Sequence, residues 1–246
     1  MNLNVERILI IGLGMIGASI ALASRSKGIK VTGYDIDSNS VKNAFQSQII
    51  DDEASSIEQI NSKEYVKDID LIILAIPPKQ TLDVLNSLQE VWNTDTTITE
   101  TSSVKNHIKI EGVSNIVLSH PIAGSDQSGL LAADENLFKN KKNVLCNPFN
   151  SDKDHYDKVE NFWSNALQMK TALMKVSEHD LIFAMTSHLP HLISYALIDS
   201  IRLSNNDVGD NAGGGIKEFL RLSGSNPEMW RDIFMLNRVD LIKALA

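Results

Sequence analysis

The stretch Ile8-Leu9-Ile10-Ile11-Gly12-Leu13-Gly14-Met15-Ile16-Gly17 decides the fold of this 246-residue chain. Its four aliphatic residues are typical of a strand buried on both faces, and residues 18–27 follow at helical spacing. The Gly-x-Gly-x-x-Gly pattern between them is the turn of a βαβ unit that binds a dinucleotide. In such a turn Gly12 permits the tight bend, Gly14 lets backbone N–H groups approach a pyrophosphate, and Gly17 lets helix and strand pack closely. The pyrophosphate is expected at the N-terminus of the helix, where unpaired N–H groups favour an anion.

An acidic residue follows at the distance that this motif requires. Residues 30–35 predict a second strand that ends in Asp35, eighteen residues after Gly17. A carboxylate at this place can accept hydrogen bonds from both ribose hydroxyls of an adenosine, and it repels a 2′-phosphate. Because no arginine stands beside Asp35, we expect the cofactor to be NAD rather than NADP.

The composition is that of an ordinary globular protein, with 43% hydrophobic and 22% charged residues. A net charge of −8 argues against binding to nucleic acid or to an anionic membrane surface. We identify no long apolar run that would span a membrane, and the chain enters its first strand almost directly, which predicts no signal peptide. A single cysteine cannot form an internal disulfide, so we expect a protein of the reducing cytoplasm. The single cysteine, Cys146, lies in an apolar strand pattern, so we expect a buried small hydrophobe rather than a nucleophile.

Strand and helix patterns alternate from residue 1 to about residue 176, which predicts an α/β domain with a Rossmann-type parallel sheet. Strand patterns disappear after that point. Ser177-x-x-Asp180 is typical of a capping box at the start of a long apolar helix, and further helices are expected over residues 216–222 and 227–246. We therefore divide the chain into an NAD-binding domain, residues 1–176, and an all-helical domain, residues 177–246. The broad apolar face of the long helix must pack against other helices or a second subunit.

The carboxyl ends of parallel strands are where ligands bind in an open α/β sheet. Two loops expected there, residues 101–105 and 119–125, carry hydroxyl, amine and imidazole groups. His120 is the strongest candidate, because an imidazole that titrates near neutrality can take a proton from an alcohol while a hydride leaves the same carbon. The alternative is a histidine that only hydrogen-bonds the turn before Pro121.

Two histidines stand on the otherwise apolar helix of the second domain. His188 and His191 are three residues apart, but Pro190 disrupts the helix between them and the glutamate of a zinc-protease helix is missing, so we expect no metal site. A wall of a substrate pocket is the more consistent interpretation, with histidines that serve only a helix interface as the alternative. Arg221 could bind a substrate carboxylate through two parallel hydrogen bonds, or form only a surface ion pair.

Five motifs then occur in a characteristic order. They are Gly12-Leu13-Gly14-Met15-Ile16-Gly17, Ser103-Val104-Lys105, His120-Pro121-Ile122-Ala123-Gly124-Ser125, Ser187-His188-Leu189-Pro190-His191 and Pro227-Glu228-Met229-Trp230-Arg231-Asp232. Together they resemble the prephenate/arogenate dehydrogenase family of tyrosine biosynthesis, over nearly the whole chain. The glycine turn is shared by many dehydrogenases, whereas the motifs around His120 and His188 are far more specific.

The resemblance implies an NAD-dependent oxidative decarboxylation of prephenate, of arogenate, or of both. Hydride leaves the ring carbon that bears the hydroxyl, carbon dioxide departs, and the ring becomes aromatic. By the same resemblance His120 and Ser103 act at that hydroxyl as the catalytic residues, and the helical domain forms a homodimer. Substrate binding falls to Arg221, His191, Ser125 and Ser187, and cofactor binding to Gly12, Gly14, Met15, Ile16, Gly17, Asp35, Ile76 and Pro77. Asp126 is a candidate by position for recognising the amino group of arogenate.

Two other functions remain open at this point. A β-hydroxyacid or imine reductase on the same cofactor fold would carry a catalytic lysine in the first long helix of the second domain, and residues 177–201 contain no lysine. A non-catalytic NAD-binding regulator is the second alternative. The joint presence of His120, Ser103 and Arg221 argues against it.

Overall fold

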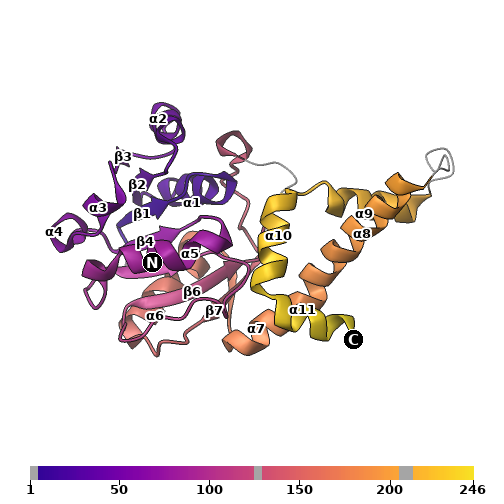
Figure 1. Cartoon of the computed structure of the whole chain (residues 1–246). Coiled ribbons are helices and arrows are strands. Elements are labelled where there is room, and N and C mark those ends of the chain that lie inside the picture. The colour runs from indigo at the N-terminus through magenta and orange to yellow at the C-terminus, as the bar shows by residue number, and fades with distance from the viewer. Residues whose placement is uncertain (1–4, 125–128, 205–212) are drawn as a thin grey trace.

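The computed structural model describes residues 5–124, 129–204 and 213–246. One sheet organises the N-terminal part of the chain, and helices form the C-terminal part (Figure 1). The strands are β1 (Arg7–Ile11), β2 (Lys30–Tyr34), β3 (Asp52–Glu53), β4 (Leu71–Leu74), β5 (Thr97–Glu100), β6 (Ile116–Pro121), β7 (Lys142–Cys146) and β8 (Lys170–Leu173). The helices around the sheet are α1 (Met15–Arg25), α2 (Ser38–Gln46), α3 (Ile57–Ile60), α4 (Lys63–Val66), α5 (Pro78–Ser87), η1 (Gln89–Val91), η2 (Leu130–Ala132), α6 (Lys153–Asn161) and η3 (Phe162–Ala166). The C-terminal helices are α7 (Val176–Phe183), η4 (Ala184–His188), α8 (Leu189–Leu203), α9 (Gly214–Ser223), α10 (Pro227–Leu236) and α11 (Arg238–Leu245).

The eight strands lie in the order β3-β2-β1-β4-β5-β6-β7-β8. The pairs from β3 through β6 are parallel, which confirms the Rossmann-type sheet that the sequence predicts. One pair departs from the parallel pattern, because β7 pairs with β6 in the antiparallel sense, and β8 runs parallel to β7.

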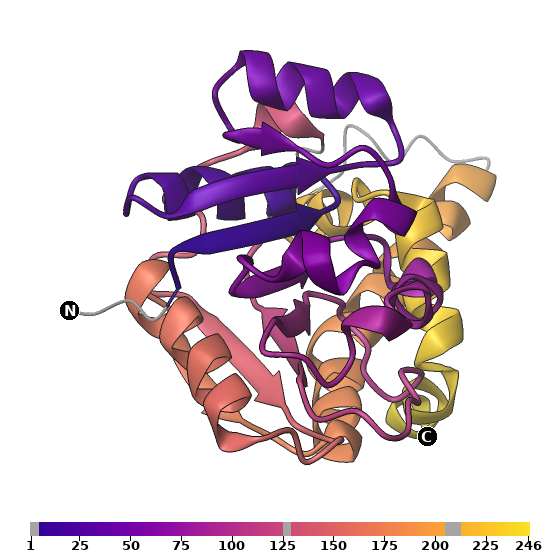
Figure 2. The same cartoon turned by 90° about the vertical axis from the view of Figure 1, so that its left-hand side faces the viewer.

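The sheet has a hydrophobic core on each face. Alternate residues of β1 enter opposite cores, with Ile8 and Ile10 in one and Leu9 and Ile11 in the other. All four residues of β4 are buried as well. Helices cover both faces (Figure 2), which explains why these central strands are apolar at every position rather than at every second one.

The helical part begins with one continuous helix made of α7, η4 and α8. Its middle segment η4 is a turn of π-helix that ends two residues before Pro190, whose missing N–H and bulky ring disturb regular α-helical bonding. The predicted capping box is wrong, because the helix starts at Val176 with Lys175 as its N-cap. The carboxylate of Asp180 is engaged instead by backbone N–H groups of a distant loop. The single helix expected over residues 227–246 is two helices, α10 and α11, that meet at Asn237.

The continuous helix also corrects the expectation that the chain holds no apolar run of membrane-spanning length. Over residues 176–203 it is long and apolar enough by length and composition alone, with a mean hydropathy of 1.4 in its best window. In the sequence, polar residues and Pro190 interrupt the apolar run, so its full length is not evident there. Three of these, His179, Asp180 and His188, are buried inside the protein, so part of this helix is an interior protein face.

Helix α10 packs beside α5, and its Trp230 and Ile233 form a small apolar cluster with Val104 from the loop after β5. This contact places α10 next to the carboxyl ends of the central strands, whereas α8 and α9 extend away from the sheet (Figure 1). The helical part therefore borders the edge of the sheet at which ligands bind in folds of this type.

Candidate active site

The glycine turn joins β1 to α1 and has the geometry that dinucleotide binding requires. Gly12 adopts a φ of +97°, and a Cβ on it would lie 2.4 Å from the carbonyl oxygen of Ala75. A Cβ on Gly17 would lie 1.9 Å from the oxygen of Gly12, so neither position tolerates a side chain. A Cβ on Gly14, in contrast, would meet no described atom within 4 Å. The turn is therefore closed on the protein side and open on the side where a pyrophosphate would approach.

The other expected cofactor contacts surround this turn. Met15 and Ile16 open α1, and the N-cap, Gly14, has no side chain with which to cap the first N–H groups. Ile76 follows β4 and lies against the turn, since its Cγ2 would be 2.8 Å from a Cβ on Gly12. Pro77 is exposed and is the N-cap of α5. These residues fit a dinucleotide that crosses the carboxyl ends of β1 and β4.

Asp35 follows β2 directly and is fixed against the turn. Its Oδ2 accepts a hydrogen bond from the backbone N–H of Leu13 at 2.7 Å, and its Oδ1 accepts one from the N–H of Asp37 at 2.9 Å. Each carboxylate oxygen has two acceptor sites, so capacity remains for ribose hydroxyls. The arrangement holds a negative charge at the place where a 2′-phosphate would lie.

His120 is the penultimate residue of β6, and only 9% of it is exposed. Its Nδ1 lies 2.8 Å from Nε2 of His179, and Nδ1 of His179 lies 2.7 Å from Oδ1 of Asp180. The ring of Phe183 packs on the His120 ring with a centroid distance of 4.6 Å. All three partners come from α7, so the first helix of the helical part holds the imidazole that the sequence singles out.

The loop after β5 is tied to the same helix. Asp180 accepts hydrogen bonds from the backbone N–H groups of Lys105 at 3.0 Å and Asn106 at 2.8 Å. Ser103 is half-buried in this loop, two residues before Lys105. The structure thus connects the segments of Ser103 and His120 through the carboxylate of Asp180.

A buried ion pair lies beneath this loop. The ammonium of Lys105 contacts the carboxylate of Glu100, and both side chains are completely buried. The same ammonium donates a hydrogen bond of 2.5 Å to the carbonyl oxygen of Ser119, the neighbour of His120. The ammonium thus connects the end of β5 with the end of β6, and removing either partner of the ion pair would leave an unpaired buried charge.

Burial lowers the pKa of His120 well below its ordinary value, and positive charge on a protonated His179, on Lys105 or on a protonated His188 lowers it further. Burial also lowers the pKa of His179, although the hydrogen bond to Asp180 opposes this shift. Both imidazoles are therefore neutral near pH 7, and His120 can act as a proton acceptor.

A second group of predicted site residues gathers on α8, α9 and α10. The ring of His191 stacks on the indole of Trp230, with centroids 3.5 Å apart and an interplanar angle of 17°. Its Nδ1 donates a hydrogen bond of 2.9 Å to the carbonyl oxygen of Ser187. Burial lowers the pKa of His191, the hydrogen bond with Ser187 opposes this shift, and the positive charge of Arg221 lowers the pKa further. Trp230 also packs on Val104, so this group adjoins the loop of Ser103.

Arg221 itself faces solvent in the single chain. Its side chain is 54% exposed, and it pairs with Glu218 of the same helix at 3.2 Å. His188 is buried below, where its Nδ1 lies 3.0 Å from the amide nitrogen of Asn237, so His188 and His191 make separate contacts. Ser125 and Asp126 lie outside the described residues.

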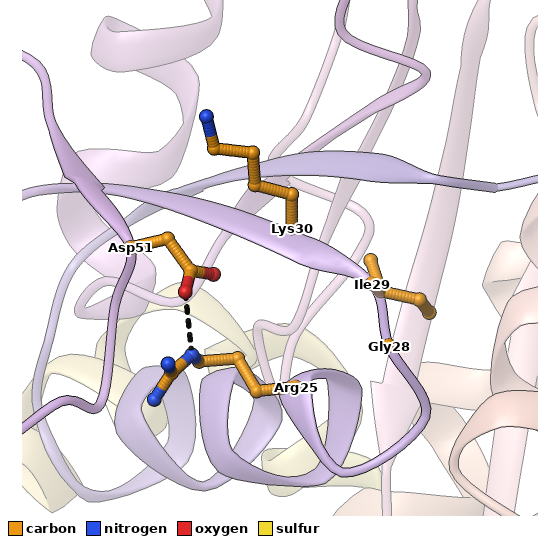
Figure 3. A pocket seen from close by; sticks show the side chains of 5 residues that line it. All are labelled: Arg25, Gly28, Ile29, Lys30 and Asp51. Carbon is orange, nitrogen blue, oxygen red and sulfur yellow. Dashed lines mark hydrogen bonds and ion pairs between the residues drawn. The ribbon is translucent and has the colours of Figure 1, made fainter.

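A hollow of about 270 Å³ opens where β2 begins, at the opposite end of this strand from the glycine turn (Figure 3). It is lined by Arg25, Gly28, Ile29, Lys30 and Asp51. Asp51 is bonded there to Arg25 at 2.9 Å and to the backbone N–H of Val31 at 2.9 Å, so its carboxylate serves the fold. The hollow lies at the amino end of β2, away from the glycine turn, and we do not assign it to the cofactor.

Comparison with known proteins identifies the family. The nucleotide-binding domain of prephenate dehydrogenase matches residues 20–170, and the dimerization domain of prephenate dehydrogenase matches residues 175–246. The chain belongs to the prephenate dehydrogenase family. This finding confirms the resemblance that the five sequence motifs carry, and it disfavours the reductase and regulator alternatives.

Individual relatives support the assignment along the whole chain. The chain is 32% identical to prephenate dehydrogenase of Bacillus subtilis, over 97% of its own length and 66% of that protein's. It is 28% identical to cyclohexadienyl dehydrogenase of Zymomonas mobilis, over 98% and 84%. The crystal structure of A. aeolicus prephenate dehydrogenase with hydroxyphenyl propionate and NAD+ superposes with a TM-score of 0.88 at 32% identity, covering 100% of this chain and 87% of that one. The chain thus spans about two thirds of the length of the Bacillus relative.

The contribution of α7 to the site is not evident from the sequence. The sequence pattern predicts Asp180 as part of a capping box, and it indicates neither the contact of His179 with His120 nor the Lys105–Glu100 pair. The available signal was a histidine and an aspartate placed side by side in a helix that is otherwise strongly apolar. Buried polar residues of that kind need partners, and here the partners are His120 and the loop of Ser103.

Proposed function

We propose that the chain catalyses the NAD-dependent oxidative decarboxylation of prephenate, of arogenate, or of both. The main observation behind this proposal is the neutral imidazole of His120. It lies at the carboxyl end of β6, on the same edge of the sheet as the glycine turn and Asp35. The family assignment and the relatives named for prephenate and cyclohexadienyl oxidation support the same reaction.

The cofactor is NAD in this proposal. The turn around Gly12, Gly14 and Gly17 would hold the pyrophosphate, and Asp35 would accept the ribose hydroxyls. Met15, Ile16, Ile76 and Pro77 would line the dinucleotide. NAD supplies the acceptor for a hydride when it is bound.

His120 and Ser103 act at the ring hydroxyl of the substrate. His120 takes the hydroxyl proton while the hydride leaves the carbon that bears it, and Ser103 donates a hydrogen bond to the oxygen on which charge develops. The ring carboxylate then leaves as carbon dioxide. Because the product ring is aromatic, the overall step is strongly downhill, and the main task of the protein is to orient the ring against the cofactor.

Orientation falls to the group on the helical part. Arg221 would bind a substrate carboxylate, and His191, held flat against Trp230, would line the same site with Ser187. We also propose that Ser125 binds the substrate, and the support for this is the sequence motif from His120 to Ser125. The exposure of Arg221 in the single chain supports a site that is closed only when a second subunit or the substrate is present.

The helical part also supports a homodimer. Large apolar side chains are exposed on α7 to α11, and a monomer would gain by burying them. They are Leu181, Met185, Ile193, Leu203, Leu220, Met229, Met235, Val239, Ile242 and Leu245. The matching dimerization domain of the family covers the same residues, 175–246. We retain the division into residues 1–176 and 177–246, together with a cytoplasmic location for an enzyme that uses a small soluble substrate.

The experiment that tests the function is a comparison of four substrate and cofactor pairs. The purified chain is assayed for reduced cofactor by absorbance at about 340 nm with prephenate or arogenate, each with NAD or NADP. We expect turnover with NAD and at least one of the two substrates. The proposal fails if neither substrate is turned over, and the reading of Asp35 fails if NADP is preferred.

A further inference from the structure

Three buried side chains, His120, His179 and Asp180, form a single line of hydrogen bonds whose proton positions follow from simple chemistry. Burial alone would raise the pKa of Asp180, but hydrogen bonds from His179 and from the N–H groups of Asn106 and Lys105 lower it below its ordinary value. An ionised carboxylate can only accept, so Nδ1 of His179 must carry the proton across the 2.7 Å contact.

The next link in the line is then determined. A neutral imidazole carries one proton, so Nε2 of His179 has a lone pair and must accept. Nδ1 of His120 is therefore the donor across the 2.8 Å contact between the two rings. The remaining nitrogen of His120, Nε2, is left with its lone pair on the opposite side of the ring.

We propose that His179 and Asp180 are positioning residues that hold His120 in the Nδ1–H tautomer, with the lone pair of Nε2 presented to the substrate hydroxyl. The part of this inference that concerns the substrate rests on the proposed function, whereas the tautomer itself does not. Neither residue touches the reacting atoms, and both act through His120.

The residues around these three side chains support a role in fixing the proton on His120, beyond a purely structural hydrogen bond. Phe183 packs on both rings, at centroid distances of 4.6 Å to His120 and 4.5 Å to His179, and so limits their rotation. Asp180 is held in turn by two backbone N–H groups of the loop after β5. Each member of the line is therefore restrained from outside it.

The titratable and charged groups around His120 come from several elements. His179 and Asp180 belong to α7, His188 to η4, Lys105 to the loop after β5, and the partner of Lys105, Glu100, to the end of β5. The positive charge of Lys105 disfavours a proton on His120, whereas the carboxylate of Asp180 stabilises the cation that forms when His120 takes one. The line thus gives a base that is neutral at rest and supported when protonated.

Because α7 belongs to the helical part and β6 to the sheet, this tautomer depends on how the two parts dock. The contacts of Asp180 with the loop of Ser103 fix that docking at the site itself. The helical part would then contribute to the chemistry as well as to substrate binding.

The first test is the proton position in the unmodified protein. Nitrogen-15 NMR of the histidine-labelled chain distinguishes a protonated from an unprotonated ring nitrogen, and the His120→Asn variant assigns the His120 signals by their disappearance. We expect a proton on Nδ1 and none on Nε2, for both His120 and His179. A proton on Nε2 of His120 overturns the proposal.

The second test reverses the direction of the hydrogen bonds by changing Asp180. In Asp180→Asn the amide oxygen can still accept from the loop N–H groups, while the amide nitrogen donates to Nδ1 of His179. His179 would then carry its proton on Nε2 and push His120 into the wrong tautomer. We expect the His120 signals to invert and kcat to fall by about 1,000-fold, with the KM for NAD unchanged. An unchanged tautomer in the folded variant contradicts the proposal.

The third test separates positioning from packing. His179→Gln places an amide oxygen that can accept from His120 near the position of Nε2, whereas His179→Leu has no acceptor. We expect the Gln variant to retain the tautomer and to lose less than about 10-fold in kcat, and the Leu variant to lose about 100-fold. Equal losses in both variants overturn the proposal. His155→Leu, at a histidine bonded to Thr97 at the other end of β5, controls for removal of a partly buried ring.

These experiments also distinguish failure of the proposed function from failure of the positioning role of His179 and Asp180. If the unmodified chain oxidises neither prephenate nor arogenate, the proposed function fails, and the NMR measurements still decide the tautomer. If the chain is active but His120 carries its proton on Nε2, the function stands and the positioning role falls.

Discussion

The backbone N–H of Leu13 donates a hydrogen bond of 2.7 Å to Oδ2 of Asp35. This bond joins the glycine turn to the end of β2, so the carboxylate that we propose for the adenosine ribose also shapes the turn. The two roles can be separated because an amide oxygen can replace the carboxylate as acceptor for Leu13 but carries no charge.

Asp35→Asn is expected to weaken NAD binding by about 10-fold and to narrow the preference for NAD over NADP, because repulsion of the 2′-phosphate is lost. Asp35→Ala removes the anchor of Leu13 as well and is expected to weaken both cofactors. Fluorescence titration of each variant with both cofactors measures the effect. An unchanged NAD-to-NADP ratio in Asp35→Asn would show that Asp35 does not select the cofactor.

Two glycines of the turn give a matched pair of substitutions. A Cβ on Gly17 would overlap the oxygen of Gly12, whereas a Cβ on Gly14 would point into open space among the described residues. Gly17→Ala is expected to lower the melting temperature or prevent folding, and Gly14→Ala to leave it nearly unchanged while weakening NAD binding by about 10-fold or more. Thermal unfolding and NAD titration together test this. Normal NAD affinity in Gly14→Ala would mean that the pyrophosphate does not lie at the turn.

Arg221 tests the assignment of the substrate carboxylate. Arg221→Ala is expected to raise the KM for the substrate by about 10- to 100-fold while the KM for NAD stays the same. Arg202→Ala is the control, because Arg202 is also exposed and pairs with Asp199 within one helix, as Arg221 does with Glu218. Similar small effects in both variants would reduce Arg221 to a surface ion pair.

The buried histidines predict the acid sensitivity of the fold. Burial lowers the pKa of His188 to about 4, so the unfolded chain takes up a proton at higher pH than the folded one does. The stability contributed by neutral His188 is complete above its ordinary pKa and is lost as the pH falls from about 6.5 toward 4. Between about pH 7.5 and pH 5 this amounts to about 2 kcal/mol in the free energy of unfolding.

The His188→Asn variant isolates this contribution. Its side-chain oxygen can accept from Asn237, as Nδ1 of His188 does, but it does not titrate. Urea unfolding of both proteins at the two pH values gives the difference. An equal loss of stability in the variant and the parent protein would show that His188 is not responsible.

The sequence predicts those parts of the molecule that depend on short stretches of chain. The turn around Gly12, the strand that leads to Asp35, and the helical C-terminal part all follow from local spacing. His120 could be found because its motif is local as well. The direction of β7 could not, because it depends on the path between strands rather than on the strand's own residues.

The partners of His120 could not be predicted for the same reason. His179 lies 59 residues further along the chain, and the contact exists only because α7 docks on the ends of β5 and β6. The local pattern favoured a capping role for Asp180, and two backbone N–H groups of a distant loop took that carboxylate instead. Tertiary contacts outweighed a local preference worth about 1 kcal/mol.

The most direct test of the central claim compares the parent chain with His120→Asn. Each protein is first titrated with NAD, and NADH formation from prephenate and from arogenate is then followed at about 340 nm. We expect NAD to bind both proteins with similar affinity and kcat to fall by about 100- to 10,000-fold in the variant, because the proton acceptor is lost while the cofactor site is intact. Turnover by His120→Asn at the rate of the parent chain would contradict the account.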